Sequence, residues 1–90
     1  MWSIEEHRQL EKKWVRFPHQ ILKKYELWKS IVRYNGPYTL RDFRGFHDEA
    51  LKGEWKGFRS SRFNLQFRVI YEVFEKENLV RVEDVNPHQY

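Results

Sequence analysis

The sequence contains no cysteine and no long apolar run. Without cysteine there is no disulfide and no thiolate metal site, and nothing indicates an oxidising compartment. No apolar run approaches the length of a membrane-spanning helix, and no charged start precedes an apolar centre as in a signal peptide. We therefore expect a soluble, cytoplasmic protein with no membrane contact.

Aromatic side chains are abundant and must supply much of the core. The 90 residues include four Trp, five Tyr and seven Phe, and each such side chain buries a large apolar area. A chain of this length has room for one compact core. Residues 1–90 are therefore predicted to form a single domain.

Positive charge is concentrated in one segment, although the net charge of +4 is mild. Positions 52–68 carry five basic residues and one acidic residue, whereas positions 69–85 carry two basic and five acidic residues. This clustering favours a polyanionic ligand; a solvated charged surface is the alternative. The basic residues are Lys52, Lys56, Arg59, Arg62 and Arg68.

Two helices are expected in the first half of the chain. Residues 7–16 are helical in type, with Leu10 and Trp14 one turn apart, and Pro18 separates them from a second helix. Before them, residues 3–6 (SIEE) fit either a helix-capping box or a short strand.

The second helix has the clearest pattern. Apolar residues recur at i, i+4, i+7 and i+11 from Ile21 to Val32, and the sequence NGP at 35–37 provides a stop. Residues 38–54 have no clean period, so we expect a loop with one short turn. Three of its side chains are expected to pack beneath the helices: Leu40, Phe43 and Phe46.

From position 55 the hydrophobic period becomes two, which predicts an antiparallel meander. The strands are expected at 57–63, 67–75 and 79–85, with tight turns between them. In the middle strand one face should meet the helices, and the other is half polar and not expected to be core. The first face holds Phe67, Val69, Tyr71 and Val73, and the second holds Arg68, Ile70, Glu72 and Phe74.

Cationic and titratable side chains converge at one rim of this meander. If the first turn centres on Leu65, Arg62 lies opposite Arg68, and an anion between them would offset the repulsion of like charges. After Asn86 and Pro87 turn the chain off the last strand, His88 and Tyr90 reach the same rim. Histidine can exchange a proton at neutral pH, and tyrosine can stack on a base.

Cleavage of RNA without a metal requires a base, an acid and a cation at the phosphate. The loop before the basic segment offers His47, Asp48 and Glu49 as further participants. The same three residues with His88 could instead hold a metal ion, but their spacing matches no known ligand motif. We therefore predict no metal and no cofactor.

The stretch DEALKGEWKGFRSSRFNLQFRVIYEV, followed by a terminal His and Tyr, resembles the RelE/ParE superfamily of bacterial type II toxins. Within it the closer likeness is to the mRNA-cleaving RelE and YoeB branch. The resemblance implies an α+β fold: a short N-terminal strand beside the three-stranded meander in a mostly antiparallel sheet. It also implies a two-helix hairpin on one face and a catalytic concave face opposite.

The resemblance also implies roles for particular residues. Glu49 takes the place of the carboxylate that acts as base, and Arg68 takes the place of the arginine that holds the phosphate. His88 and Tyr90 match the catalytic tail, although Gln89 separates them whereas the YoeB pattern has them adjacent. Either can be the proton donor, and our hypothesis assigns that role to His88. The expected RNA-binding residues are Lys52, Lys56, Arg59 and Arg62.

The function implied is that of a toxin that cleaves mRNA, in association with the ribosome, and that a cognate antitoxin protein neutralises. Two alternatives share the fold or the charge. One is a ParE-like toxin that binds DNA gyrase and cuts no RNA, and the other is a basic RNA-binding module without catalysis. A gyrase binder has no need of an acid, a base and a cation together.

Overall fold

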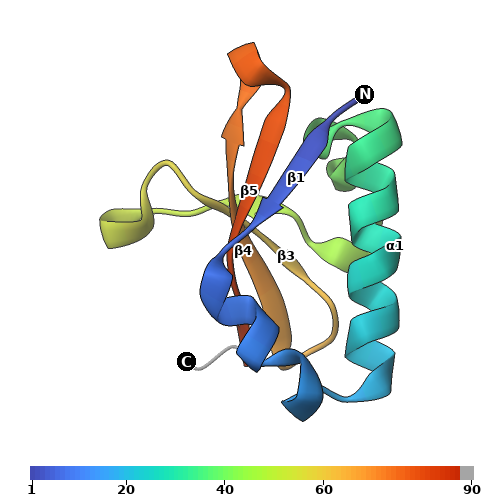
Figure 1. The fold of residues 1–90 in the computed structure, drawn as a ribbon. Coiled ribbons are helices and arrows are strands. Elements are labelled where there is room, and N and C mark those ends of the chain that lie inside the picture. The colour runs from blue at the N-terminus through green and yellow to red at the C-terminus, as the bar shows by residue number, and fades with distance from the viewer. Residues whose placement is uncertain (88–90) are drawn as a thin grey trace.

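The computed structural model describes residues 1–87; the last three residues, 88–90, lie outside the described part. The chain forms one long helix and a five-stranded sheet, joined by short 3₁₀ turns (Figure 1). The strands are β1 (Ser3–Glu6), β2 (Glu49–Ala50), β3 (Arg59–Arg62), β4 (Phe67–Phe74) and β5 (Leu79–Pro87), and the helix is α1 (His19–Asn35).

The sheet has the strand order β1-β5-β4-β3-β2. The strands β3, β4 and β5 form the expected antiparallel meander, and β1 joins β5 in parallel, with Ser3 opposite Leu79. The α+β fold and the first strand implied by the resemblance are therefore confirmed. The segment 3–6 is a strand and not a helix cap, because its backbone pairs with β5.

Helix α1 packs along one face of the sheet (Figure 1). It begins directly after Pro18, and its predicted apolar stripe is buried, with Trp28 and Val32 fully inaccessible. It ends at Asn35, and the next residue, Gly36, has a φ of 88°, a left-handed value that side chains disfavour. A Cβ at this glycine would also lie 3.0 Å from the indole Nε1 of Trp2, so conformation and close packing both require glycine.

The first of the two expected helices is not an α-helix. Residues 8–16 form two 3₁₀ turns, η1 (Arg8–Lys12) and η2 (Trp14–Arg16). So few residues cannot sustain an α-helix by propensity alone, and contacts with the rest of the protein decide their shape. Leu10 enters the core, and the ring of Trp14 stacks on Tyr25 with centroids 5.1 Å apart.

The segment between α1 and β3 has more structure than the sequence predicted. It contains the turns η3 (Pro37–Asp42), η4 (Arg44–Phe46) and η5 (Gly53–Trp55), and the edge strand β2. Leu40 and Phe46 are buried as expected, but Phe43 is 46% exposed. The strand β2 exists only because its two residues pair with β3. Two residues are too few to show a hydrophobic period in the sequence.

The two faces of the sheet differ as the alternation in β4 predicts. Val69 and Tyr71 are fully buried against α1, and Phe67 and Val73 pack beside them. Ile70 is an exception on the other face, because it is buried although that face was not expected to be core. Between Ile70 and Tyr71 the register with β5 shifts by one residue, as in a β-bulge.

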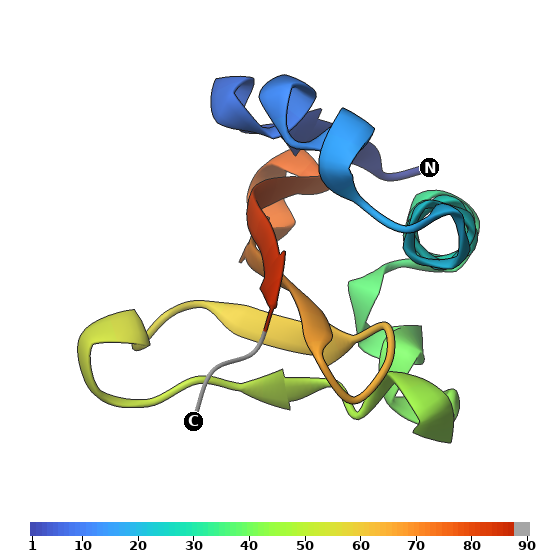
Figure 2. The same cartoon turned by 90° about the horizontal axis from the view of Figure 1, so that it is seen from below.

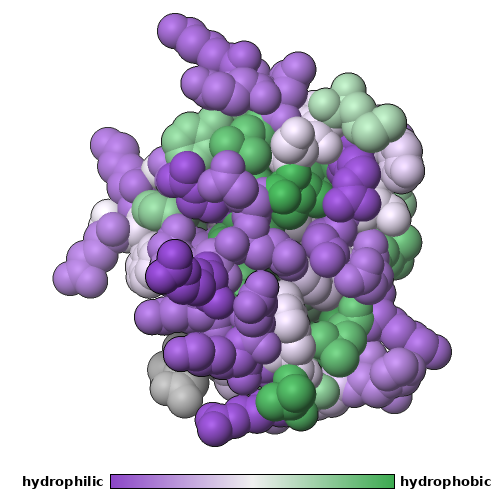
Figure 3. All heavy atoms as spheres, in the orientation of Figure 1, coloured by the Kyte–Doolittle hydropathy of each residue, from purple (hydrophilic) through white to green (hydrophobic). Residues whose placement is uncertain are grey.

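The face of the molecule seen in Figure 3 is mostly hydrophilic. Its hydrophobic side chains occupy separate small areas. Within residues 1–87, no helix is both long enough and apolar enough to cross a membrane.

Replacing Leu10 tests whether the η1–η2 segment is part of the core. Leu10→Ala should lower the free energy of unfolding by about 2–5 kcal/mol, because truncation leaves a cavity where the side chain is buried. Chemical denaturation measures this change. The matched control is Val15→Ala in the same segment; Val15 is 88% exposed, and its loss should cost less than about 0.5 kcal/mol. Equal effects of the two substitutions would contradict this packing.

Candidate functional site

The candidate site lies on the sheet face opposite α1, which we call the open face. Paired residues on neighbouring strands share a face, so the register defines two rows of side chains there. One row runs across β2, β3, β4 and β5, and the other crosses β3, β4 and β5. The first is Glu49, Ser60, Ile70 and Asp84, and the second is Arg62, Arg68 and Asn86.

Two arginines face each other in the second row. Arg62 pairs with Arg68 across β3 and β4, which confirms the register predicted from a turn centred on Leu65. The Nε atom of Arg68 is buried, and it has no hydrogen-bond partner within residues 1–87. A buried donor without a partner costs free energy, more so when it carries charge. An anion at Arg68 would remove that cost.

Asp84, on the strand next to Arg68, does not neutralise it. Its Oδ1 accepts a hydrogen bond from Lys13 Nζ at 2.6 Å, and its Oδ2 accepts one from Asn86 Nδ2 at 2.6 Å. Burial raises the pKa of Asp84, but these hydrogen bonds outweigh it and hold the pKa below its ordinary value. The carboxylate is therefore satisfied by groups other than Arg68.

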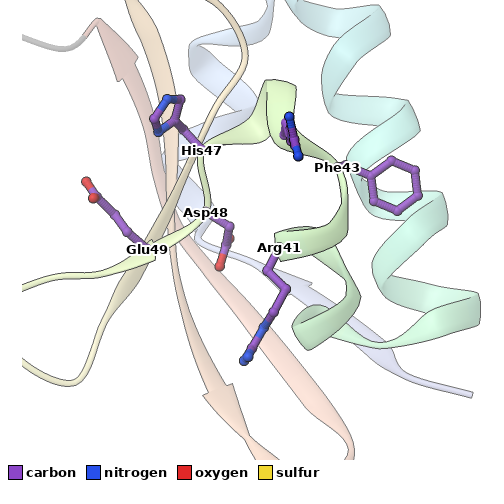
Figure 4. Close-up of a pocket in the computed structure, with 6 residues that line it drawn as sticks. Arg41, Phe43, His47, Asp48 and Glu49 are labelled. Carbon is purple, nitrogen blue, oxygen red and sulfur yellow. The ribbon is translucent and has the colours of Figure 1, made fainter.

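Glu49 lies on the open face at the sheet edge, as the neighbour of Ser60. Its register partner on β4 is Ile70, which lies two strands away and two residues along β4 from Arg68. Standard sheet spacing therefore puts the Cα atoms of Glu49 and Arg68 about 12 Å apart. Glu49 is exposed, and its side chain points away from α1, as does that of His47 (Figure 4). The carboxylate and the guanidinium can thus reach toward one another with a ligand between them.

Asp48, the residue before Glu49, points to the other face and is buried, with its side chain 1% exposed. Its Oδ1 accepts hydrogen bonds from Arg59 Nη2 at 2.6 Å and Nε at 3.0 Å. Its Oδ2 accepts hydrogen bonds from Ser61 Oγ at 2.6 Å and from the Tyr71 hydroxyl. Ser61 in turn accepts a hydrogen bond from Trp28 Nε1 at 3.0 Å. Asp48 thereby ties the chain before β2 to β3, β4 and α1.

The protonation of this cluster is set by the same contacts. Burial, followed by the charge of Asp48, raises the pKa of the Tyr71 hydroxyl far above its ordinary value, so Tyr71 remains a donor. Burial lowers the pKa of Arg59, but the hydrogen bonds to Asp48 and Tyr71 and the charge of Asp48 together outweigh it and raise that pKa. Asp48 is consequently a structural carboxylate.

The metal alternative is not supported at Asp48. Both of its oxygens accept hydrogen bonds from protein donors, and its side chain lies on the face opposite to Glu49. Among residues 1–87 no cluster of three His, Asp or Glu side chains has the proximity that a metal ion needs.

The structure does not bring all expected RNA-binding residues to the open face. Arg59 pairs with Tyr71 on the α1 side and forms the ion pair with Asp48. Arg59 precedes Ser60 on β3, so strand alternation directs it to the α1 side. The number of basic residues in positions 52–68 therefore overstated the positive charge on the open face. Lys52 and Lys56 are exposed in the connection from β2 to β3, which extends on the side away from α1 (Figure 2).

Strand β5 continues further than predicted. Asn86 and Pro87 do not turn away, because they pair with Arg68 and Phe67 at the end of the strand. Proline is tolerated here because β1 ends opposite Val82, so no strand needs its missing N–H on that side. The two predicted tail residues, His88 and Tyr90, lie outside the described residues.

Sequence reasoning missed the role of Asp48 and the pairing of Asp84 with Lys13. The second pair joins residues 71 positions apart, and no local pattern indicates it. A usable signal existed for Asp48. Strand alternation places Arg59, Ser61 and Tyr71 on the face that meets the helix, and polar side chains on that face require a polar partner.

Comparison with known proteins supports the fold. No protein-family model matches the sequence, and no curated protein matches it significantly. Among solved structures, YafQ from E. coli strain BL21(DE3) has a TM-score of 0.77 at 22% identity, covering 98% of this chain and 94% of YafQ. RelE in the RelE–RelB complex of Pyrococcus horikoshii OT3 has a TM-score of 0.77 at 21% identity, covering 96% and 93%. The YoeB/ParE toxin of Agrobacterium tumefaciens has a TM-score of 0.69 at 21% identity, covering 97% and 99%.

The Asp48 cluster predicts a large effect on stability. Asp48→Asn should lower the free energy of unfolding by roughly 3 kcal/mol, because it leaves Arg59 without its counter-charge in a partly buried site. Chemical denaturation measures the change. The control is Asp42→Asn, an exposed aspartate on η3, for which we expect a change below about 0.5 kcal/mol. A stable Asp48→Asn protein would show that the cluster does not hold the sheet edge.

Asp84 predicts a specific dependence of stability on pH. Because its pKa is lowered in the folded state, the ion pair with Lys13 stabilises the protein above the ordinary carboxyl pKa of about 3.9. That contribution disappears as the pH falls through the lowered folded-state value. The difference in unfolding free energy between the unmodified protein and Asp84→Asn should therefore shrink from neutral pH toward acid. Lys13→Gln should converge in the same way; a constant difference across this range would refute the assignment.

Proposed function

We propose that this protein is the toxin of a type II toxin–antitoxin pair and that it cleaves mRNA without a metal ion. The observation that carries the proposal is the buried Nε of Arg68, which has no partner within residues 1–87 and lies on one face with Arg62 and Glu49. Guanidinium groups suit the planar, multidentate contact that a phosphate offers. The fold is compatible with this activity but does not decide it.

The chemistry assigned to the open face is a transesterification. Glu49 removes the proton of a ribose 2′-hydroxyl, and the resulting oxygen attacks the adjacent phosphorus. Arg68 stabilises the charge that develops on the phosphoryl oxygens. The bond to the 5′-oxygen of the next nucleotide breaks, and an acid protonates that oxygen. The products are a 2′,3′-cyclic phosphate and a 5′-hydroxyl.

The acid in this scheme is His88, and Tyr90 stacks on a base or orients the phosphate. The assignment uses the sequence and the end of β5. Pro87 pairs with Phe67, the neighbour of Arg68, so the described end of β5 lies beside the part of β4 that carries Arg68.

The expected substrate is mRNA bound to the ribosome in the cytoplasm, and the expected regulator is an antitoxin protein. The partner follows from likeness alone: the archaeal RelE of similar fold was solved together with RelB. Exposed Lys52 and Lys56, with Arg62 on the open face, supply contacts to the RNA backbone that position it without reading its sequence.

Induced expression of the protein alone should arrest growth and produce mRNA fragments with 2′,3′-cyclic phosphate ends. Substitutions Glu49→Gln, Arg68→Gln and His88→Gln should each abolish the arrest. A general acid or base contributes about 10²–10⁴-fold to the rate, and loss of a group that stabilises the developing charge costs about 10²–10³-fold. Growth curves and sequencing of the fragment ends measure both effects. The matched control is Glu54→Gln, which removes an exposed carboxylate nearby in the chain and should remain toxic.

The same panel separates the alternatives. A toxin that binds DNA gyrase would arrest growth with intact mRNA and would stay toxic with glutamine at position 49. An RNA-binding module would bind mRNA but produce no cyclic phosphate ends. Normal growth on expression of the unmodified protein would contradict the toxin function.

A further inference from the structure

A surface hollow of about 340 Å³ lies at the sheet edge directly before β2. Its walls come from η3, η4 and the two residues that lead into β2 (Figure 4). Glu49 is part of the wall, so the hollow is continuous with the open face. The lining residues are Arg41, Phe43, Arg44, His47, Asp48 and Glu49.

The charge of this hollow is positive although it contains two carboxylates. Asp48 is already neutralised by Arg59, which leaves Glu49 as the one uncompensated acid of the lining. Arg41 and Arg44 are exposed, and neither appears in an ion pair within residues 1–87. Two cations beside an exposed cavity favour a ligand that carries phosphate.

An aromatic ring is held at the same place. Phe43 is 46% exposed, and its ring centroid lies 6.3 Å from that of the buried Phe46. Phe46 belongs to the core, and Lys24 Nζ lies 5.3 Å from its ring centroid. Exposed rings beside cations are the combination on which bases of single-stranded nucleic acid stack. Phe43 was expected to be core, and its exposure has no packing explanation within residues 1–87.

We infer that this hollow binds the nucleotide on the 5′ side of the cleaved phosphate in single-stranded RNA. The inference rests on the proposed function, because the assigned chemistry decides which end of the RNA chain, 5′ or 3′ of the cut, enters the hollow. The 2′-hydroxyl that Glu49 deprotonates belongs to the nucleotide 5′ of the cut, and Arg68 holds the phosphate that follows. The upstream chain therefore leaves past Glu49, away from Arg68, and enters the hollow. Arg41 and Arg44 contact its phosphates, and Phe43 stacks on its base.

Binding of RNA tests this site independently of cleavage. The probe is a short fluorescent single-stranded RNA with 2′-O-methyl groups, which prevent attack by the 2′-oxygen. The double substitution Arg41→Gln, Arg44→Gln should weaken binding roughly 25-fold at 0.1 M salt, because each lost phosphate contact reduces the slope of log K against log salt by about 0.7. Fluorescence anisotropy across a range of salt concentrations measures the affinity and the slope.

The matched control removes the same charge elsewhere. Lys23 on α1 and Lys76 on η6 (Glu75–Glu77) are exposed and lie outside the hollow. Lys23→Gln with Lys76→Gln should leave the salt slope unchanged. Equal weakening by both pairs, or no weakening by the arginine pair, would overturn the inference. An unchanged unfolding midpoint for both variants establishes that the comparison is between folded proteins.

Cleavage-site mapping in a translation extract tests the assigned direction. Phe43→Leu, which removes the ring that stacks on the base, should change the base preference at the nucleotide 5′ of the cut and leave the preference on the 3′ side as it is. An unchanged 5′ preference in proteins that still cut would overturn the inference while the proposed function stands. If the unmodified protein cuts no RNA, the proposed function fails, and the inferred 5′-nucleotide subsite is overturned with it. The binding comparison would then show only whether the hollow holds RNA. If the arginine pair weakened the binding of an acidic protein segment and left RNA binding unchanged, the hollow would be a protein-binding site. That result would overturn the inference.

Discussion

The buried carboxylate of Asp48 is the contact on which the geometry of the sheet edge depends. It accepts hydrogen bonds from Arg59, Ser61 and Tyr71, and Ser61 links it to Trp28 on the helix. A lone buried charge would be expensive, but a charged partner and further donors offset its desolvation. Because the side chain of Asp48 is fixed toward α1, the next side chain along the strand must point to the opposite face. Glu49 is presented there as a result.

The two aspartates next to the open-face strands form their hydrogen bonds and ion pairs with groups other than Arg68. Asp84 is satisfied by Lys13 and Asn86, and Asp48 is satisfied by Arg59 on the far side of the sheet. Arg68 therefore has no carboxylate partner among the described residues, and it faces Arg62 directly. Two like charges in register destabilise a sheet. In the proposed function, an anionic ligand between the two guanidinium groups would offset this repulsion.

Much of the fold was predictable because its longest elements have strong periods. The apolar stripe of α1 and the alternation in β4 each extend over several turns or residue pairs, so local sequence determines them. The turn centred on Leu65 set the register of β3 with β4, and hence the meeting of Arg62 and Arg68. The resemblance to known toxins added the first strand and the place of Glu49. Short elements, such as β2 and the η1 turn, carry too few residues to show a period.

The sequence by itself determined the helix, the meander and the face on which Arg68 lies, because these follow from patterns between near neighbours, and its resemblance to known toxins implied the α+β arrangement. Only the tertiary structure decided which charges remain available. Arg59 lies in the same basic segment as Arg68, yet strand alternation directs it to the other face, where it forms an ion pair with the buried Asp48. Lys13 neutralises Asp84 from a segment 71 positions away. Ion pairs depend on distance in space, and residue order does not encode that distance until the chain has folded.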